Sequence, residues 1–181
     1  AALKKTTLTG LKMVALLTIP AMVWLIVLAE PIVRLVFERG AFDLRSTSMT
    51  TQALNFYVLG LFALGAFNVL NRTFYALHDT KTPVFISIFA AGANLGLSLV
   101  LVRSLQHAGL ALASALASNL NFLLTYFFIR FRLPNYRERD LWLPLGKIVL
   151  ASAIMGLGIW GSAWLVASLL GTGAGAEGAL G

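Results

Sequence analysis

Five long apolar stretches, separated by short polar segments, constrain this chain of 181 residues more than any other feature. A helix rises about 1.5 Å per residue, so about 20 apolar residues cross a hydrocarbon core of about 30 Å. The stretches lie at about 13–29, 50–71, 83–103, 109–129 and 145–170. Backbone groups in lipid must pair within the protein, and five separate stretches cannot close a barrel. The sequence therefore predicts an all-α fold, a polytopic transmembrane helical bundle with five spans.

The composition points to the same class of protein. Hydrophobic residues make up 59% of the chain and charged residues only 12%, whereas soluble domains carry about 25% charged residues. The net charge is +7, but the basic residues lie in the gaps between apolar stretches. This distribution favours membrane topology over nucleic acid binding, so we expect no nucleic acid partner. The chain has no cysteine and two distant histidines, so no metal site is assigned.

The basic residues are divided unequally between the two sets of span ends. One set carries ten of the 14, namely Lys4, Lys5, Lys12, Arg72, Lys81, Arg130, Arg132, Arg137, Arg139 and Lys147. The opposite set carries Arg34, Arg39, Arg45 and Arg103. Cytoplasmic loops hold the excess of Lys and Arg. We therefore predict a cytoplasmic N-terminus for this segment and a cytoplasmic turn at 72–82, with residues 30–48 and 103–108 outside.

Three segments lie outside the predicted spans. Glu30, Arg34 and Glu38 recur at every fourth position, which predicts a short amphipathic helix at about 30–39, lying at the membrane interface. Residues 130–147 form a basic linker with two prolines, long enough to run along a membrane surface. The Gly-rich segment 172–181 is predicted to be a flexible tail, which leaves 1–171 as the membrane domain.

The most polar stretch between two spans runs from Arg72 to Val84 and carries charges of both signs. It predicts a tight turn that joins two apolar helices. Thr82 is the candidate N-cap of the second helix, and Pro83 would occupy its first position, where the missing N–H costs nothing.

Small and polar residues form one stripe on each of the third and fourth spans. The stripes are Ser87, Ala91, Asn94 and Ser98, and then Ala111, Ser114, Ser118, Asn121 and Thr125. The segment between the two spans is short, so we expect them to be antiparallel neighbours. The stripes fit either close helix packing with amides bonding across the interface or the wall of a cavity.

Three stretches resemble the MurJ (MviN) family of lipid II flippases, within the larger superfamily of multidrug, oligosaccharidyl-lipid and polysaccharide exporters. They are Phe37-Glu-Arg-Gly-Ala-Phe42, Phe74-Tyr-Ala-Leu-His-Asp-Thr-Lys-Thr-Pro-Val84 and His107-Ala-Gly-Leu-Ala-Leu-Ala113. The second is the most specific, because Phe-Tyr followed by Asp-x-Lys-Thr-Pro at this spacing is close to a family signature.

The resemblance implies a transporter of fourteen helices in two lobes, of which this chain matches about helices nine to thirteen. The implied function is translocation of lipid II, a peptidoglycan precursor linked to undecaprenyl diphosphate, across the bacterial cytoplasmic membrane by alternating access. The implied partners are lipid II, membrane lipids and the N-terminal lobe of the same protein. No cofactor is implied, and the energy would come from a monovalent cation such as sodium or from the membrane potential.

Two groups of candidate site residues follow from the resemblance. Arg72, Asp79 and Lys81 would either form a turn that starts a helix or belong to an inner gate whose ion pairs break as the lobes rock. The cavity or cation candidates are Asn94, Ser98, Ser114, Ser118 and Asn121. Asn94 matches a position near the sodium ion of some family members, whereas Ser98 places a hydroxyl where Asn or Asp is common.

Other functions stay open at this point. A membrane enzyme acting on polyprenyl phosphates would need clustered acidic or histidine residues near one membrane face, and only seven acidic residues are present. We therefore expect a protein that is not an enzyme. A related O-antigen or drug exporter is the alternative transporter, and the chain taken alone could be an inactive fragment.

Overall fold

The computed structural model describes residues 2–37, 44–132 and 139–169, and in these ranges every regular element is a helix. The helices are α1 (Ala2–Val27), α2 (Ala29–Phe37), α3 (Leu44–Val58), α4 (Leu61–Ala76), α5 (Lys81–Arg132) and α6 (Arg139–Leu169). Four stretches are long and apolar enough to cross a membrane, and one of them runs from α3 through α4. The prediction of an all-α membrane bundle is confirmed.

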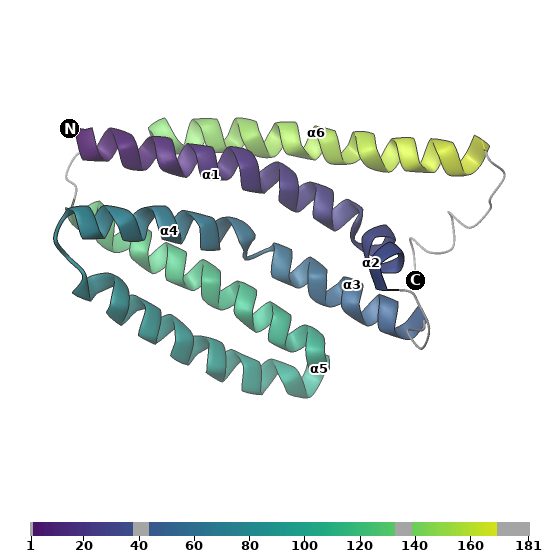
Figure 1. The fold of residues 1–181 in the computed structure, drawn as a ribbon, viewed down its shortest axis with the longest axis horizontal. Coiled ribbons are helices and arrows are strands. Elements are labelled where there is room, and N and C mark those ends of the chain that lie inside the picture. The colour runs from purple at the N-terminus through teal and green to yellow at the C-terminus, as the bar shows by residue number, and fades with distance from the viewer. Residues whose placement is uncertain (1, 38–43, 133–138, 170–181) are drawn as a thin grey trace.

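The helix α5 contains two of the predicted spans. It is interrupted at Gln106, whose φ of 51° and ψ of −127° are not helical. Residues 81–105 form a first arm and residues 107–132 a second arm that runs back beside it (Figure 1). A Cβ on Gly109 would collide with the carbonyl of Leu101, so glycine lets the arms meet at the turn. The predicted antiparallel pair is confirmed.

The predicted span at 50–71 lies within a stretch long enough and apolar enough to cross a membrane, Arg45–Ala76, but this stretch is two helices, because the chain breaks at Leu59 and Gly60 between α3 and α4. A Cβ on Gly60 would lie 3.0 Å from the Cα of Ala115, so the second arm of α5 packs backbone against backbone there. The carbonyl of Leu59 accepts a hydrogen bond from Nδ2 of Asn119 at 3.2 Å. A side chain from the neighbouring helix thus pairs a carbonyl at the break.

Two other boundaries differ from the predictions. α1 begins at Ala2 rather than near residue 13, and α6 begins at Arg139 rather than near residue 145. Part of the predicted linker 130–147 is therefore helical, including Pro144. The helix expected at 30–39 is present as α2, where Glu30 and Arg34 form an ion pair at 2.6 Å. Its place at the interface stays a prediction, and Glu38 and the tail 172–181 lie outside the described residues.

The core lies where α1, α4 and the second arm of α5 meet. Its buried residues are Leu8, Leu11, Ala66, Leu70, Phe74 and Ile129. Beside them, the hydroxyls of Thr7 and Thr73 share a hydrogen bond of 2.9 Å, which pairs both groups inside the bundle.

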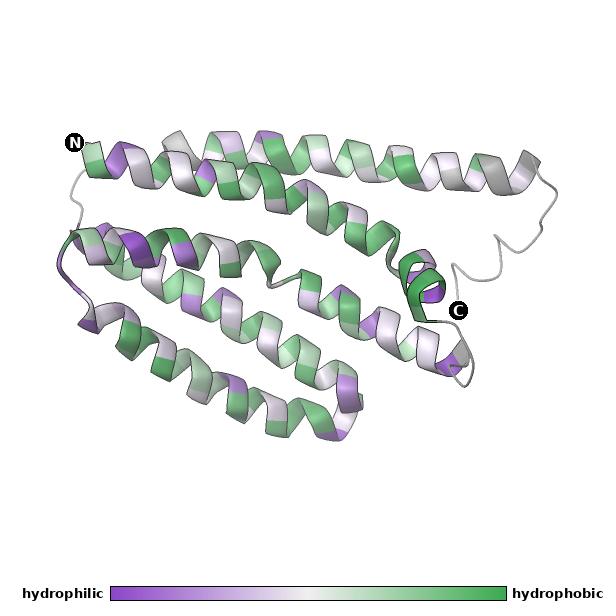
Figure 2. Cartoon of the chain, in the orientation of Figure 1, coloured by the Kyte–Doolittle hydropathy of each residue, from purple (hydrophilic) through white to green (hydrophobic). Residues whose placement is uncertain are grey.

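The outer surface carries many large apolar side chains. Leu17, Phe85 and Leu157 are 73%, 69% and 70% exposed, and green apolar residues recur along every helix (Figure 2). Such a surface fits lipid rather than water as the main solvent. Figure 1 places the N-terminus, the α4–α5 turn and the end of α5 at one end of the bundle. These segments carry basic residues of the larger set, so the two ends of the bundle differ in charge as the sequence predicts.

Candidate functional site

The α4–α5 turn is closed by the backbone of its own residues. His78 adopts a left-handed conformation with a φ of 57°. Its N–H donates to the carbonyl of Tyr75 at 3.0 Å, and the N–H of Asp79 donates to the carbonyl of Phe74 at 3.0 Å. These two bonds form a Schellman motif, which pairs carbonyls that the end of a helix would otherwise leave free.

The carboxylate of Asp79 opens the next helix. It accepts hydrogen bonds from the N–H of Thr82 at 3.1 Å and from the Thr82 hydroxyl at 2.7 Å. Asp79 is therefore the cap of α5, and the prediction of Thr82 as N-cap is wrong. Pro83 is the third residue of α5 rather than the first, still within the first turn, where a proline is tolerated.

An ion pair ties this turn to the far end of α5. Nη2 of Arg132 lies 3.1 Å from Oδ2 of Asp79, whose side chain is 16% exposed. The Thr82 backbone N–H, the Thr82 hydroxyl, the Arg132 guanidinium and the Lys81 N–H together hold the pKa of Asp79 below its ordinary value of 3.8. The carboxylate is thus ionised at neutral pH.

The other two gate candidates, Arg72 and Lys81, do not take part in this ion pair. Arg72 is exposed on α4, and Lys81 is exposed at the start of α5. Among the described side chains, Asp79 forms its ion pair with Arg132 and with neither of these residues. Sequence reasoning missed Arg132, although the charge bias had already assigned it to the same end of the bundle.

The two polar stripes of α5 face each other across a groove of about 240 Å³. Four of the five cavity candidates line it, and the lining residues are Ser87, Ala90, Ala91, Asn94, Ser114, Ala117, Ser118 and Asn121. Ser98 is absent from this lining, and its hydroxyl lies 3.4 Å from Oδ1 of Asn94, one turn away along the first arm.

The groove offers oxygen atoms rather than charges. The Ser118 hydroxyl donates to the carbonyl of Ser114 at 2.9 Å. Oδ1 of Asn121 is buried without a hydrogen-bond partner among the described residues. None of the described lining residues is acidic. Amide and hydroxyl oxygens without a carboxylate can hold water, a donor from another chain segment, or a weakly bound cation.

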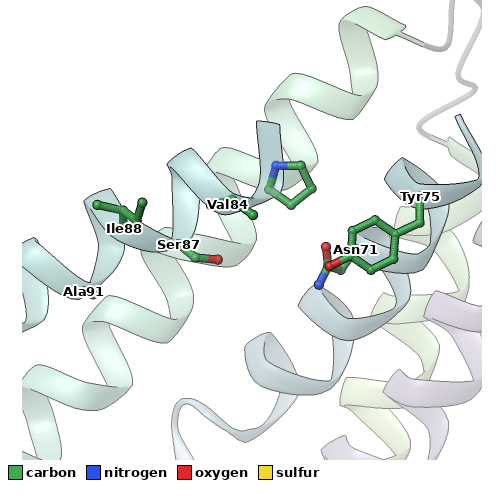
Figure 3. A pocket seen from close by; sticks show the side chains of 7 residues that line it. Asn71, Tyr75, Val84, Ser87, Ile88 and Ala91 are labelled. Atoms are coloured by element: carbon green, nitrogen blue, oxygen red, sulfur yellow. The ribbon is translucent and has the colours of Figure 1, made fainter. Parts of the chain in front are cut away.

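A second groove, of about 280 Å³, adjoins the first (Figure 3). Asn71 and Tyr75 of α4 lie on one side of it, and Val84, Ser87 and Ile88 of α5 lie on the other (Figure 3). Oδ1 of Asn71 is buried there, also without a partner among the described residues.

Because Ser87 and Ala91 line both grooves, the two form one surface. We call its polar residues the polar trough, which consists of Asn71, Ser87, Asn94, Ser114, Ser118 and Asn121. Asn71 and Ser87 were not among the predicted site residues. The amide at the end of the second span was the signal for Asn71, and the stripe on the third span already contained Ser87.

The sequence matches the family described as Lipid II flippase MurJ over residues 1–176. It is 34% identical over 142 residues to a probable lipid II flippase MurJ of Rickettsia prowazekii, covering 78% of this chain and 28% of that protein. A probable lipid II flippase MurJ of Rhizobium meliloti is 36% identical over 144 residues, which cover 80% and 27% of the two chains.

A third relative, the lipid II flippase MurJ of Thermosipho africanus, is 33% identical over 121 residues, covering 67% of this chain and 26% of that protein. The chain thus spans about a quarter of the length of these curated relatives. The family match includes the α4–α5 turn and both arms of α5, the segments that hold the capping aspartate and most of the polar trough. The chain belongs to the lipid II flippase MurJ family.

Proposed function

We propose that this chain is part of a transporter that moves lipid II across the bacterial cytoplasmic membrane by alternating access. The observation that carries the proposal is the family match over residues 1–176, nearly the whole chain. The multi-pass helical bundle supports it, because a flippase needs membrane-spanning helices that can rock against another lobe. The other lobe would come from the part of the relatives that this chain does not match.

The proposed orientation places the N-terminus and the α4–α5 turn in the cytoplasm. Basic residues support it: Lys4 and Lys5 belong to the first turn of α1, Arg72 to the last two turns of α4, and Arg132 ends α5. The start of α1 and the ends of α4 and α5 lie at one end of the bundle (Figure 1). The diphosphate of lipid II would then start its passage at the basic end. A charge crossing 100 mV is worth about 2.3 kcal/mol, so the membrane potential could supply the energy.

The polar trough is the proposed site of coupling. Buried amide oxygens without partners are costly inside a membrane. Asn71 and Asn121 each have such an oxygen among the described residues, so a ligand or another segment of the protein would stabilise them. A monovalent cation such as sodium, held near Asn94, is one such ligand.

For Arg72, Asp79 and Lys81 we propose a divided role. Asp79 mainly holds the turn in shape, since its carboxylate already caps α5 and pairs with Arg132. Arg72 and Lys81 are exposed at the same end and could pair with the opposite lobe in one state of an inner gate.

Complementation tests the proposal. A bacterium depleted of its own lipid II flippase is expected to grow when it expresses the full-length protein that contains this chain. The 181-residue chain alone is expected to insert without restoring growth, since it spans about a quarter of its relatives. The full-length protein could instead reach the membrane and confer drug resistance or O-antigen export without restoring growth. That result would favour the alternative exporters.

A further inference from the structure

A groove on the opposite side of the bundle from α5 lies between α1 and α6, which run side by side (Figure 1). Its volume is about 280 Å³. Leu16 and Pro20 of α1 line one wall, and Ile148, Ala151 and Met155 of α6 line the other. This groove shares no residue with the polar trough and plays no part in the function proposed above.

The walls of this groove are apolar, although one serine contributes to them. Ser152 also lines it, but its side chain is 2% exposed and its hydroxyl donates to the carbonyl of Ile148 at 2.7 Å. The hydroxyl is therefore satisfied within its own helix. Further along the helices, Gly156 packs against Val23, where an added Cβ would lie 2.6 Å from a valine methyl. This contact brings the two helices together beyond the groove.

One end of the groove is positively charged. Lys147 lines it and is exposed. Lys12 lies one helical turn before Leu16, on the same face of α1, and is half-buried. No carboxylate among the described residues forms an ion pair with either lysine. A lysine of this kind lays its alkyl stem along apolar surface and holds its ammonium group toward the headgroups.

We propose that this groove binds an anionic membrane phospholipid, with one acyl chain between α1 and α6 and the headgroup phosphate at Lys147 and Lys12. The charge complementarity decides the occupant. An apolar helix of this protein or of a second copy would cover the groove walls equally well, but it would bring no partner for the two ammonium groups. Basic pockets between transmembrane helices on the cytoplasmic side bind anionic headgroups for this reason.

The amount of lipid that the purified protein retains tests the proposal directly. The full-length protein, purified in detergent, is mixed with phosphatidylglycerol or with phosphatidylcholine of the same acyl chains, and bound lipid is counted by native mass spectrometry. We expect preferential retention of phosphatidylglycerol, reduced about fivefold by Lys147→Gln. Lys5→Gln removes the same charge from an exposed site on α1 that does not line the groove, and it should leave retention unchanged.

A second variant tests the acyl chain separately from the charge. Ala151→Phe adds a side chain to an exposed position in the groove wall and should lower retention of both lipids. A phosphatidylglycerol with a photoreactive group in its acyl chain should label peptides that contain Leu16 or Met155. Circular dichroism and gel filtration establish that each variant is folded.

Three results would overturn the proposal. Equal retention of the two lipids would show that the bound lipid is ordinary annular lipid. Unchanged phosphatidylglycerol retention in the Lys147→Gln variant would show that the lysine does not bind the headgroup. Photolabelling confined to other parts of the protein would show that another segment or a second copy covers the groove.

Discussion

The α4–α5 turn and the polar trough are both polar islands in an apolar chain, yet they satisfy their polar groups in opposite ways. In the turn, the N–H and the carboxylate of Asp79 both have partners within the described structure. In the trough, Oδ1 of Asn71 and Oδ1 of Asn121 are buried without one. Unpaired buried groups cost stability unless something else binds them. This difference supports an architectural role for the turn and our proposal that the trough binds a ligand or a partner segment.

The largest effect is expected from Asp79→Ala. It removes the cap of α5 and the ion pair with Arg132 together, so the melting temperature of the purified protein should fall by several degrees. Asp79→Asn keeps an oxygen that can accept from the Thr82 N–H, so its melting temperature should fall less. Arg132→Gln removes only the ion pair with Asp79, in which the arginine side chain is 63% exposed, so its melting temperature should fall least. Equal losses in all three variants would mean that the ion pair, not the cap, holds the turn.

Replacing the trough amides should act in the opposite direction. Asn71→Leu and Asn121→Leu each remove a buried unpaired oxygen, so the purified protein should be more stable by about 1–3 kcal/mol per site. Growth in the complementation assay should fall, because the ligand or partner of that oxygen is lost. Asn119→Leu is the matched control, since Asn119 already donates to the carbonyl of Leu59 and its loss should destabilise. Destabilisation by all three would erase the contrast between turn and trough.

The acid stability of the turn follows from the lowered pKa of Asp79. A carboxylate whose folded pKa is depressed stabilises the fold fully above its unfolded pKa, here the ordinary value of 3.8. This contribution is lost as the pH falls below 3.8 and through the lower folded pKa. Thermal melts across this range should show a steeper acid loss for the wild type than for Asp79→Asn. Parallel curves would show that the carboxylate gains nothing from its neighbours in the fold.

His78→Gly should stabilise the turn slightly. A side chain in the left-handed region costs about 1–2 kcal/mol, which glycine avoids, while its greater freedom in the unfolded chain costs about half of that gain. The net effect should be a gain below about 1 kcal/mol in a denaturant titration. His78→Ala keeps the strain and should show no such gain, so equal effects of the two variants would exclude backbone conformation as the cause.

The smallest effect concerns sodium. If the trough holds a cation, sodium should raise the melting temperature of the full-length protein relative to choline at equal ionic strength. Asn94→Ala should abolish this shift, whereas Ser98→Ala should leave most of it, because Ser98 does not line the groove. A shift retained in Asn94→Ala would move the cation elsewhere and leave the trough to another occupant.

Much of the fold followed from one-dimensional patterns. Apolar runs of spanning length predicted the helices, and the short segment 103–109 predicted the antiparallel arms of α5. Regular spacing placed Asn94 and Asn121 on polar stripes, but it left open whether these stripes pack together or line the groove that the structure shows. The break at Gly60 was missed because the apolar run continues through it. Only the close approach of Ala115 gives that glycine its role.

By itself the sequence determined which stretches are apolar enough to span a membrane, which ends of the spans are basic, and which family the chain resembles. Hydropathy and charge act residue by residue, so they can be read without knowing which helix faces meet. The tertiary structure alone decided that Asp79 pairs with Arg132, that Asn71 extends the trough, and that Lys147 ends an apolar groove. Each of these depends on distances between helices, which no local pattern encodes.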